Sequence, residues 1–180
     1  MADSSVVDTN VLIVASAADD GSPFQPDATP VQEASLRKEV LDWLQGFETD
    51  PERSVVLDWD WHICNEYQNK LNLEQDYGWL AIMSKKDRNE VVWVGIEIDE
   101  NGHAQMPLGL RQAVNDLADR KMVAAVLSAK VEGNACRLVN ACDTDWLDCE
   151  LALKAADIEV HQLLNEWLKR RHESKKKRGE

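Results

Sequence analysis

The chain has 180 residues, of which 44% are hydrophobic and 29% are charged. This length suits one domain that buries about 70% of the surface of its unfolded chain, and the composition is typical of a globular protein rather than a disordered or fibrous one. The formal net charge of −13 counts against a general affinity for nucleic acid, which depends on neutralising phosphates.

The charge is unevenly distributed along the chain. Residues 169–180 (KRRHESKKKRGE) hold seven Lys or Arg and two Glu, or +5, which leaves −18 for residues 1–168. We therefore expect a domain at 1–168 and a basic C-terminal tail at 169–180. Runs of like charge are usually solvated and disordered, so we expect a disordered tail, with a local phosphate-binding patch as the alternative.

Several protein classes are disfavoured by what the sequence lacks. No run approaches the roughly 20 apolar residues that span a bilayer, and the segment MADSSVV does not resemble a secretory signal. The four cysteines, none in a CxxC pair, are expected to be thiols without zinc. A cysteine nucleophile with a histidine base stays open. We expect a cytoplasmic protein with no membrane partner.

Strand and helix patterns alternate along the first half of the chain. A β-branched run precedes Asp8, and residues 18–30 are rich in Gly, Pro and Asp. The predicted elements are a strand at 4–8, a helix at 9–17, a loop at 18–30, a helix at 31–47, a strand at 54–59 and a helix at 62–72.

The same alternation continues in the second half. The predicted elements are a short helix at 73–87, a strand at 90–99 that enters a turn at 100–102, a helix at 108–121, another starting near Asp119, a strand at 137–140, a helix at 143–156, a strand at 158–161, and a final helix whose apolar stripe is Val160, Leu163, Leu164, Trp167 and Leu168. Such alternation predicts an α/β fold with a mainly parallel central sheet flanked by helices.

Acidic residues stand where this fold would place a site. Asp8 follows the first strand, Asp143 and Asp145 follow the strand at 137–140, and Glu66 lies one turn into the helix after the second strand. Asp119 shares a helix face with Val123. Ligands bind at the carboxyl edge of such sheets, and converging carboxylates need a hard cation such as Mg²⁺ to offset their repulsion. The sequence therefore predicts a metal site.

Each acid also has an interpretation that needs no metal. Asp119, Asp143 or Asp145 could cap a helix, which is worth roughly 1 kcal/mol, and Glu66 could lie on a solvated helix face. Asp8 is the hardest to explain in this way, because it interrupts the apolar run VVDTNVLIV. Thr9, Asn10 and Thr144 could orient the acids or cap the neighbouring helices.

Four motifs in order give the chain a resemblance to a known family: VVDTNVL, ICNEYQNKL, ADRKMVAAVL and LVNACDTDW. They resemble the PIN-domain nucleases, specifically the small bacterial toxins of toxin–antitoxin pairs. The resemblance spans residues 6–162 and implies a single PIN-like domain. A loop at 18–30 and an insertion at about 74–107 depart from the simplest members.

The resemblance implies a function and a set of site residues. Asp8, Glu66, Asp119 and Asp143 would be the catalytic acids that bind Mg²⁺ or Mn²⁺, with Asp145 as an auxiliary or alternative ligand. Independently of the resemblance, Arg120 and Lys121 are candidate phosphate contacts because they lie beside Asp119, with a surface role as the alternative. The expected protein is an endoribonuclease (a hydrolase) that leaves 5′-phosphate and 3′-hydroxyl ends, with RNA as its substrate, a possible antitoxin partner and a possible homodimer.

Two other hypotheses fit parts of the sequence. A PIN-like scaffold that keeps the acids but works by binding a basic partner agrees better with the acidic body. A phosphotransferase or phosphatase with an aspartyl nucleophile is disfavoured, because Asp8-Thr9-Asn10 lacks a second acid two residues on.

Overall fold

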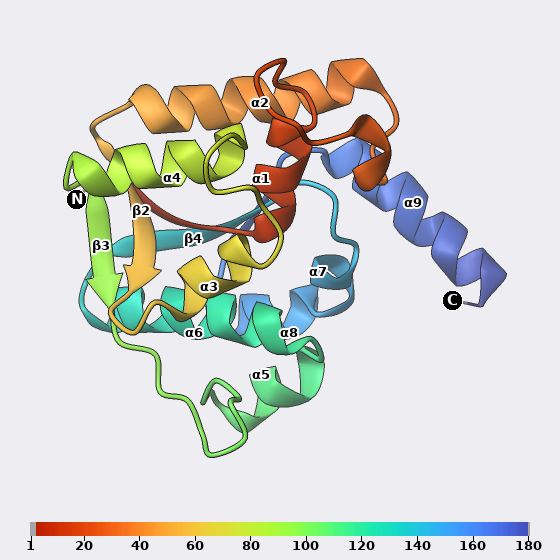
Figure 1. Cartoon of the computed structure of the whole chain (residues 1–180). Coiled ribbons are helices and arrows are strands. Elements are labelled where there is room, and N and C mark those ends of the chain that lie inside the picture. Colours follow the sequence, from red (N-terminus) through yellow and green to blue (C-terminus); the bar gives the residue numbers. More distant parts are fainter. Residues whose placement is uncertain (1–2, 180) are drawn as a thin grey trace.

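The computed structural model describes residues 3–179, and in it five parallel strands form one sheet in the order β3-β2-β1-β4-β5. This confirms the predicted α/β fold with a central parallel sheet flanked by helices (Figure 1). The strands are β1 (Asp3–Val7), β2 (Arg53–Asp58), β3 (Val91–Val94), β4 (Ala135–Asn140) and β5 (Val160–Gln162).

Helices cover both faces of the sheet. They are α1 (Thr9–Ser16), α2 (Ala34–Thr49), α3 (His62–Gln68), α4 (Tyr77–Asp87), α5 (Leu108–Ala113), α6 (Leu117–Val131), α7 (Asp145–Asp148), α8 (Glu150–Ala155) and α9 (Asn165–Arg178), with a short 3-10 helix at Pro26–Ala28. The first layer contains α1, α2 and α4, and α6 crosses the other face, with α3 and α8 on that side (Figure 1).

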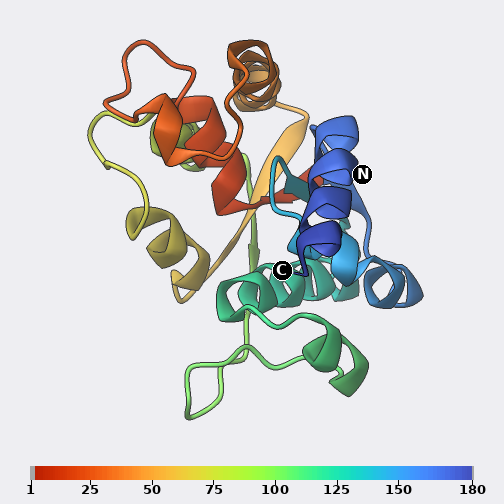
Figure 2. The same cartoon turned by 90° about the vertical axis from the view of Figure 1, so that its right-hand side faces the viewer.

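The core lies between these layers. Val6, Val56 and Leu138, on three neighbouring strands, have no exposed surface. Strands buried on both faces read as continuous apolar runs, which is why the segments around SSVV, SVVL and RLV were predictable from sequence. The parallel strands direct their carboxyl ends to one edge, where β1 passes into α1 and β4 into the chain before α7 (Figure 2).

Several predicted boundaries were wrong. The strand expected over 90–99 ends at Val94, and Ile98 forms only an isolated bridge to Ala104 on the other side of the turn. The helix expected over 108–121 is interrupted between α5 and α6, because Asp116 caps a new helix. The helix expected over 143–156 is divided into α7 and α8.

The C-terminal region also differs from expectation. Val160 was expected both in a strand at 158–161 and in the final helical stripe. It lies in the strand, where it pairs with Leu138, and α9 begins only at Asn165. Residues 169–178 continue α9 rather than forming a disordered tail. The segment expected as an insertion at 74–107 supplies α4 and the edge strand β3. Within residues 3–179, no helix combines the length and apolarity that crossing a membrane requires.

Candidate metal centre

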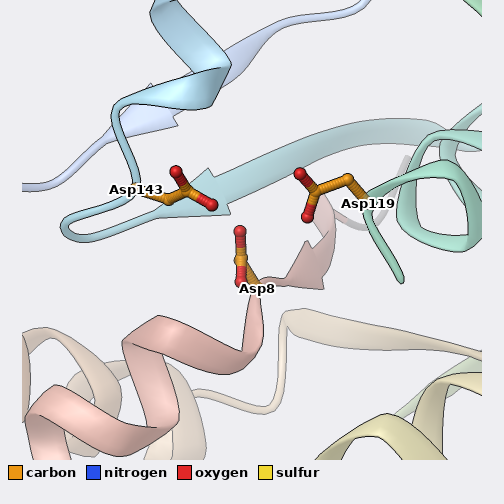
Figure 3. Close-up of side chains that lie close together, drawn as sticks. All are labelled: Asp8, Asp119 and Asp143. Carbon is orange, nitrogen blue, oxygen red and sulfur yellow. The ribbon is translucent and has the colours of Figure 1, made fainter. Parts of the chain in front are cut away.

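Three aspartates from separate elements meet at the carboxyl edge of the sheet. Asp8 lies between β1 and α1, Asp119 in the first turn of α6, and Asp143 in the loop after β4. One carboxylate oxygen from each lies within 4.8 Å of the other two, and Figure 3 shows the three carboxylates turned toward one another. In the described part of the chain, none of the three forms an ion pair with a basic side chain. The group could therefore bind a metal ion.

Asp8 is the most buried member, with 6% of its surface exposed. Its Oδ1 accepts a hydrogen bond from the backbone N–H of Asn10 at 3.1 Å, and its Oδ2 accepts one from the indole Nε1–H of Trp146 at 2.6 Å. A carboxylate oxygen has two lone pairs. Each oxygen of Asp8 therefore keeps one lone pair with which to bind a cation.

Asp119 is free to join the group because another residue caps its helix. The carboxylate of Asp116 accepts from the backbone N–H groups of Ala118 (2.8 Å) and Asp119 (3.2 Å). The capping role that the sequence left open for Asp119 thus belongs to Asp116. The Asp143 carboxylate also stabilises the turn before α7, since its Oδ1 accepts a hydrogen bond from the backbone N–H of Asp145 at 2.9 Å.

The protonation of the trio reflects burial and crowding of like charge. Burial raises the pKa of Asp8 to about 7, and the charges of Asp143 and Asp116 act in the same direction. Burial, with the charges of Asp8 and Asp143, raises the pKa of Asp119 to about 9. The pKa of Asp143 is also raised, mainly by burial. A bound cation would relieve this repulsion.

Glu66 and Asp145 lie outside the trio. Glu66 lines the same cavity, of about 230 Å³, but its Oε1 is paired with Lys121 Nζ at 2.5 Å. Asp145 is exposed, and its Oδ1 lies 3.9 Å from Lys175 Nζ. Of the two acids between which the sequence could not choose, Asp143 is the one whose carboxylate meets Asp8 and Asp119.

The two basic residues expected near the phosphate have protein partners. Lys121 pairs with Glu66, and Arg120 donates from Nε to Val114 O (2.8 Å) and from Nη2 to Arg111 O (2.9 Å), which ties α6 to the end of α5. Lys70 also lines the cavity of the trio. It was not identified from the sequence.

Other contacts that hold the site were missed because the partners are distant in sequence. Among the residues that make them, Asn10 was expected to orient Asp8 or to cap the neighbouring helix. Asn10 Oδ1 accepts from the backbone N–H groups of Ala141 and Cys142, which fixes the loop before Asp143 to the start of α1. Tyr67 donates its hydroxyl to Val7 O, next to Asp8. Buried Trp usually needs a partner for its N–H, and this tendency was the one available signal for Trp146.

The cysteines do not provide a second site. Burial raises the pKa of Cys64, Cys142 and Cys149 to about 12 and that of Cys136 to about 11, which disfavours the thiolate that a nucleophile or metal ligand requires. All four are free thiols. Within residues 3–179, the aspartate trio is the only group of three His, Cys, Asp or Glu placed to share an ion.

Comparisons with protein families, curated proteins and solved structures found no match for this chain. The chemistry of the site therefore has to follow from its own residues.

Proposed function

We propose that Asp8, Asp119 and Asp143 hold Mg²⁺ or Mn²⁺ and that the protein is an endoribonuclease that hydrolyses RNA phosphodiester bonds. The observation that carries the proposal is the convergence of three carboxylates at the carboxyl edge of a parallel sheet, with no basic partner among residues 3–179. Structural acids are normally paired when they are withdrawn from water. The motifs that resemble PIN-domain nucleases favour RNA over other substrates of metal-dependent hydrolysis.

The donor set fits a small hard cation. Mg²⁺ binds oxygen ligands at about 2.1 Å, so ligands on opposite sides of the ion lie about 4.2 Å apart. Ligands in adjacent octahedral positions lie about 3.0 Å apart, so the oxygens of the trio, which lie within 4.8 Å of one another, would have to draw closer to share one ion. Three carboxylates leave coordination positions for water and substrate, which a catalytic site requires.

The ion and the protein would have separate tasks. A divalent cation supplies an acidified water and offsets charge on the phosphate oxygens. The protein side chains would orient the ion: Trp146 and Asn10 fix Asp8, and Asp116 holds the helix turn that carries Asp119. Lys70, which lines the cavity, could contact a substrate phosphate. The products would carry 5′-phosphate and 3′-hydroxyl ends.

An activity assay with matched variants tests this proposal. The purified chain should degrade RNA with Mg²⁺ or Mn²⁺ and lose that activity in EDTA. Asp8→Asn and Asp143→Asn should each reduce the rate on the order of 100-fold or more, since each removes a charged ligand. Asp145→Asn is the control, because its carboxylate is exposed and outside the trio; it should keep most of the activity. Cleavage that survives Asp8→Asn would refute the metal-site proposal.

A second candidate function is a scaffold that binds a basic partner. The charge of −18 over residues 1–168 favours it, because such a body attracts cationic proteins and repels RNA. A basic antitoxin is one such partner if the protein is a toxin. A chain that binds Mn²⁺ yet leaves RNA intact under all metal conditions would favour this second function.

A further inference from the structure

The C-terminal helix has a charge opposite to that of the body. Within α9 lie seven Lys or Arg and only Glu166 and Glu173 as acids, or +5, against −17 for residues 1–164. The helix extends from one side of the molecule, beside the chain that leads into α7 (Figures 1 and 2). Most of the basic residues are exposed and so can meet a ligand.

One face of α9 forms a basic groove. A cavity of about 440 Å³ lies between α9 and the segment at 30–33, and its cationic lining is Arg170, Arg171, Lys175 and Arg178. Glu33 is the one acid in the lining. Among the described residues, no carboxylate pairs with Arg170, Arg171 or Arg178. The Arg171 guanidinium lies over the Trp167 ring, 5.5 Å from its centroid, which fixes its orientation.

The groove adjoins the aspartate trio through Lys175. Lys175 lines the groove and its Nζ donates to Thr144 Oγ1 at 2.8 Å, and Thr144 follows Asp143 directly. A neighbouring contact joins the same two segments, where His172 Nε2 lies 2.6 Å from Asp148 Oδ1. A ligand in the groove therefore lies next to the loop that carries Asp143.

We propose that this groove binds the phosphodiester backbone of a single RNA strand and so directs a neighbouring phosphate to the aspartate trio. This inference rests on the proposed ribonuclease function. Guanidinium groups match phosphate oxygens with paired hydrogen bonds. Because the rest of the chain is acidic and repels RNA, binding RNA requires a local cluster of cations, and the four basic residues of the groove supply one. An acidic peptide has the charge to bind here, but it has no phosphodiester bond for the neighbouring trio to hydrolyse.

Binding measured without catalysis tests the groove. Fluorescence anisotropy of a fluorescein-labelled oligouridylate is followed in EDTA, for the full chain and two double variants. Arg170→Gln/Arg178→Gln removes two groove charges. Lys169→Gln/Lys177→Gln removes the same charge from exposed positions of α9 outside the groove. Circular dichroism and the melting temperature establish that both variants keep the fold.

The groove variant should bind roughly tenfold more weakly, and the slope of log affinity against log salt should flatten by about 1.4, the value for two lost phosphate contacts with a single strand. The control should change affinity less than about twofold. Equal losses in the two variants would overturn the proposal, as would poly-glutamate competing as well as RNA of equal charge.

The two proposals fail in different ways. RNA binding that depends on the groove, without metal-dependent cleavage, would support the groove and refute the ribonuclease. Cleavage that depends on Asp8, with the groove variant binding as well as the control variant, would support the ribonuclease and refute the groove.

Discussion

The carboxylate of Asp8 depends on its hydrogen-bond donors to be a usable ligand. With 6% of its surface exposed, Asp8 has its pKa raised to about 7 by burial, and the hydrogen bond from Trp146 is the strongest influence that lowers it. Trp146 is buried and donates to Asp8, so it acts through Asp8 as a positioning residue. Such donors to a metal ligand typically affect affinity 10–100-fold.

Trp146→Phe separates this role from packing. Phenylalanine keeps an aromatic ring but leaves Oδ2 of Asp8 without its donor, so the pKa of Asp8 should rise further and protons should compete better with a cation. We expect Mn²⁺ affinity at neutral pH to fall about tenfold. Isothermal titration calorimetry measures it.

The pH dependence of the affinity distinguishes positioning from a general loss of structure. In Trp146→Phe the loss should shrink at higher pH, where Asp8 is ionised in both proteins. Trp43→Phe, on α2 and stacked on Phe47, is the matched control and should bind Mn²⁺ normally. An affinity loss of the same size at every pH would contradict the role given to Trp146.

At the scale of elements, the site depends on a close contact between α1 and α4. Gly78, in the first turn of α4, donates its backbone N–H to Ser16 Oγ at 2.9 Å. A Cβ built on Gly78 would lie 2.5 Å from Leu12 O and 2.7 Å from Leu12 Cβ. Only glycine allows this approach, and α1 begins immediately after Asp8.

The same substitution at two glycines should therefore have opposite effects. Gly78→Ala forces the helices apart, and we expect it to lower the free energy of unfolding by about 1–3 kcal/mol. Gly46→Ala, within α2 and with no atom near its Cβ position, should raise that free energy by about 0.5–1 kcal/mol because alanine is the better helix former. Urea denaturation measures both. Two stabilised variants would show that α4 can move away from α1 at no cost.

Local patterns predicted the elements but not their long-range partners. Apolar runs gave the strand before Asp8 and the strand before Asp143, and parallel pairing then brought these two acids to one edge. Val160 fitted both a strand and the final helical stripe, and its pairing with Leu138, 22 residues earlier in the sequence, places it in the strand. The Glu66–Lys121 pair spans 55 residues and the Trp146–Asp8 bond 138 residues. The periodicity of apolar residues within one element cannot predict contacts between residues so far apart in the sequence.

At the scale of the whole molecule, the trio makes stability depend on pH and on metal. The pKa of Asp8 is raised from 3.8 to about 7 and that of Asp119 from 3.8 to about 9. Between the ordinary value and each raised value, the folded chain therefore binds more protons than the unfolded chain. Stability falls with rising pH wherever the folded state holds the extra protons. The metal-free protein should lose stability as the pH rises from about 4 to about 9.

A divalent ion should reverse this trend, because it binds the ionised carboxylates and displaces their protons. We expect Mn²⁺ to raise the melting temperature little near pH 5 and most near pH 8–9, where a concentration of 100 times Kd adds about 2.7 kcal/mol. The variant Asp119→Asn separates the effect of the trio from that of other titrating groups. Glu90 is one such group: hydrogen bonds from Arg88 and Lys85 lower its pKa to about 2, so it changes stability only in acid. In EDTA at about pH 8 this variant should be more stable than the wild type, because the folded wild type must bind a proton at Asp119, which is ionised in the unfolded chain, and asparagine avoids that cost. Mn²⁺ should no longer stabilise the variant. Differential scanning fluorimetry across pH, with and without Mn²⁺, makes the comparison. An Mn²⁺ shift that is the same at pH 5 and pH 8, or that persists in Asp119→Asn, would mean that the ion binds elsewhere.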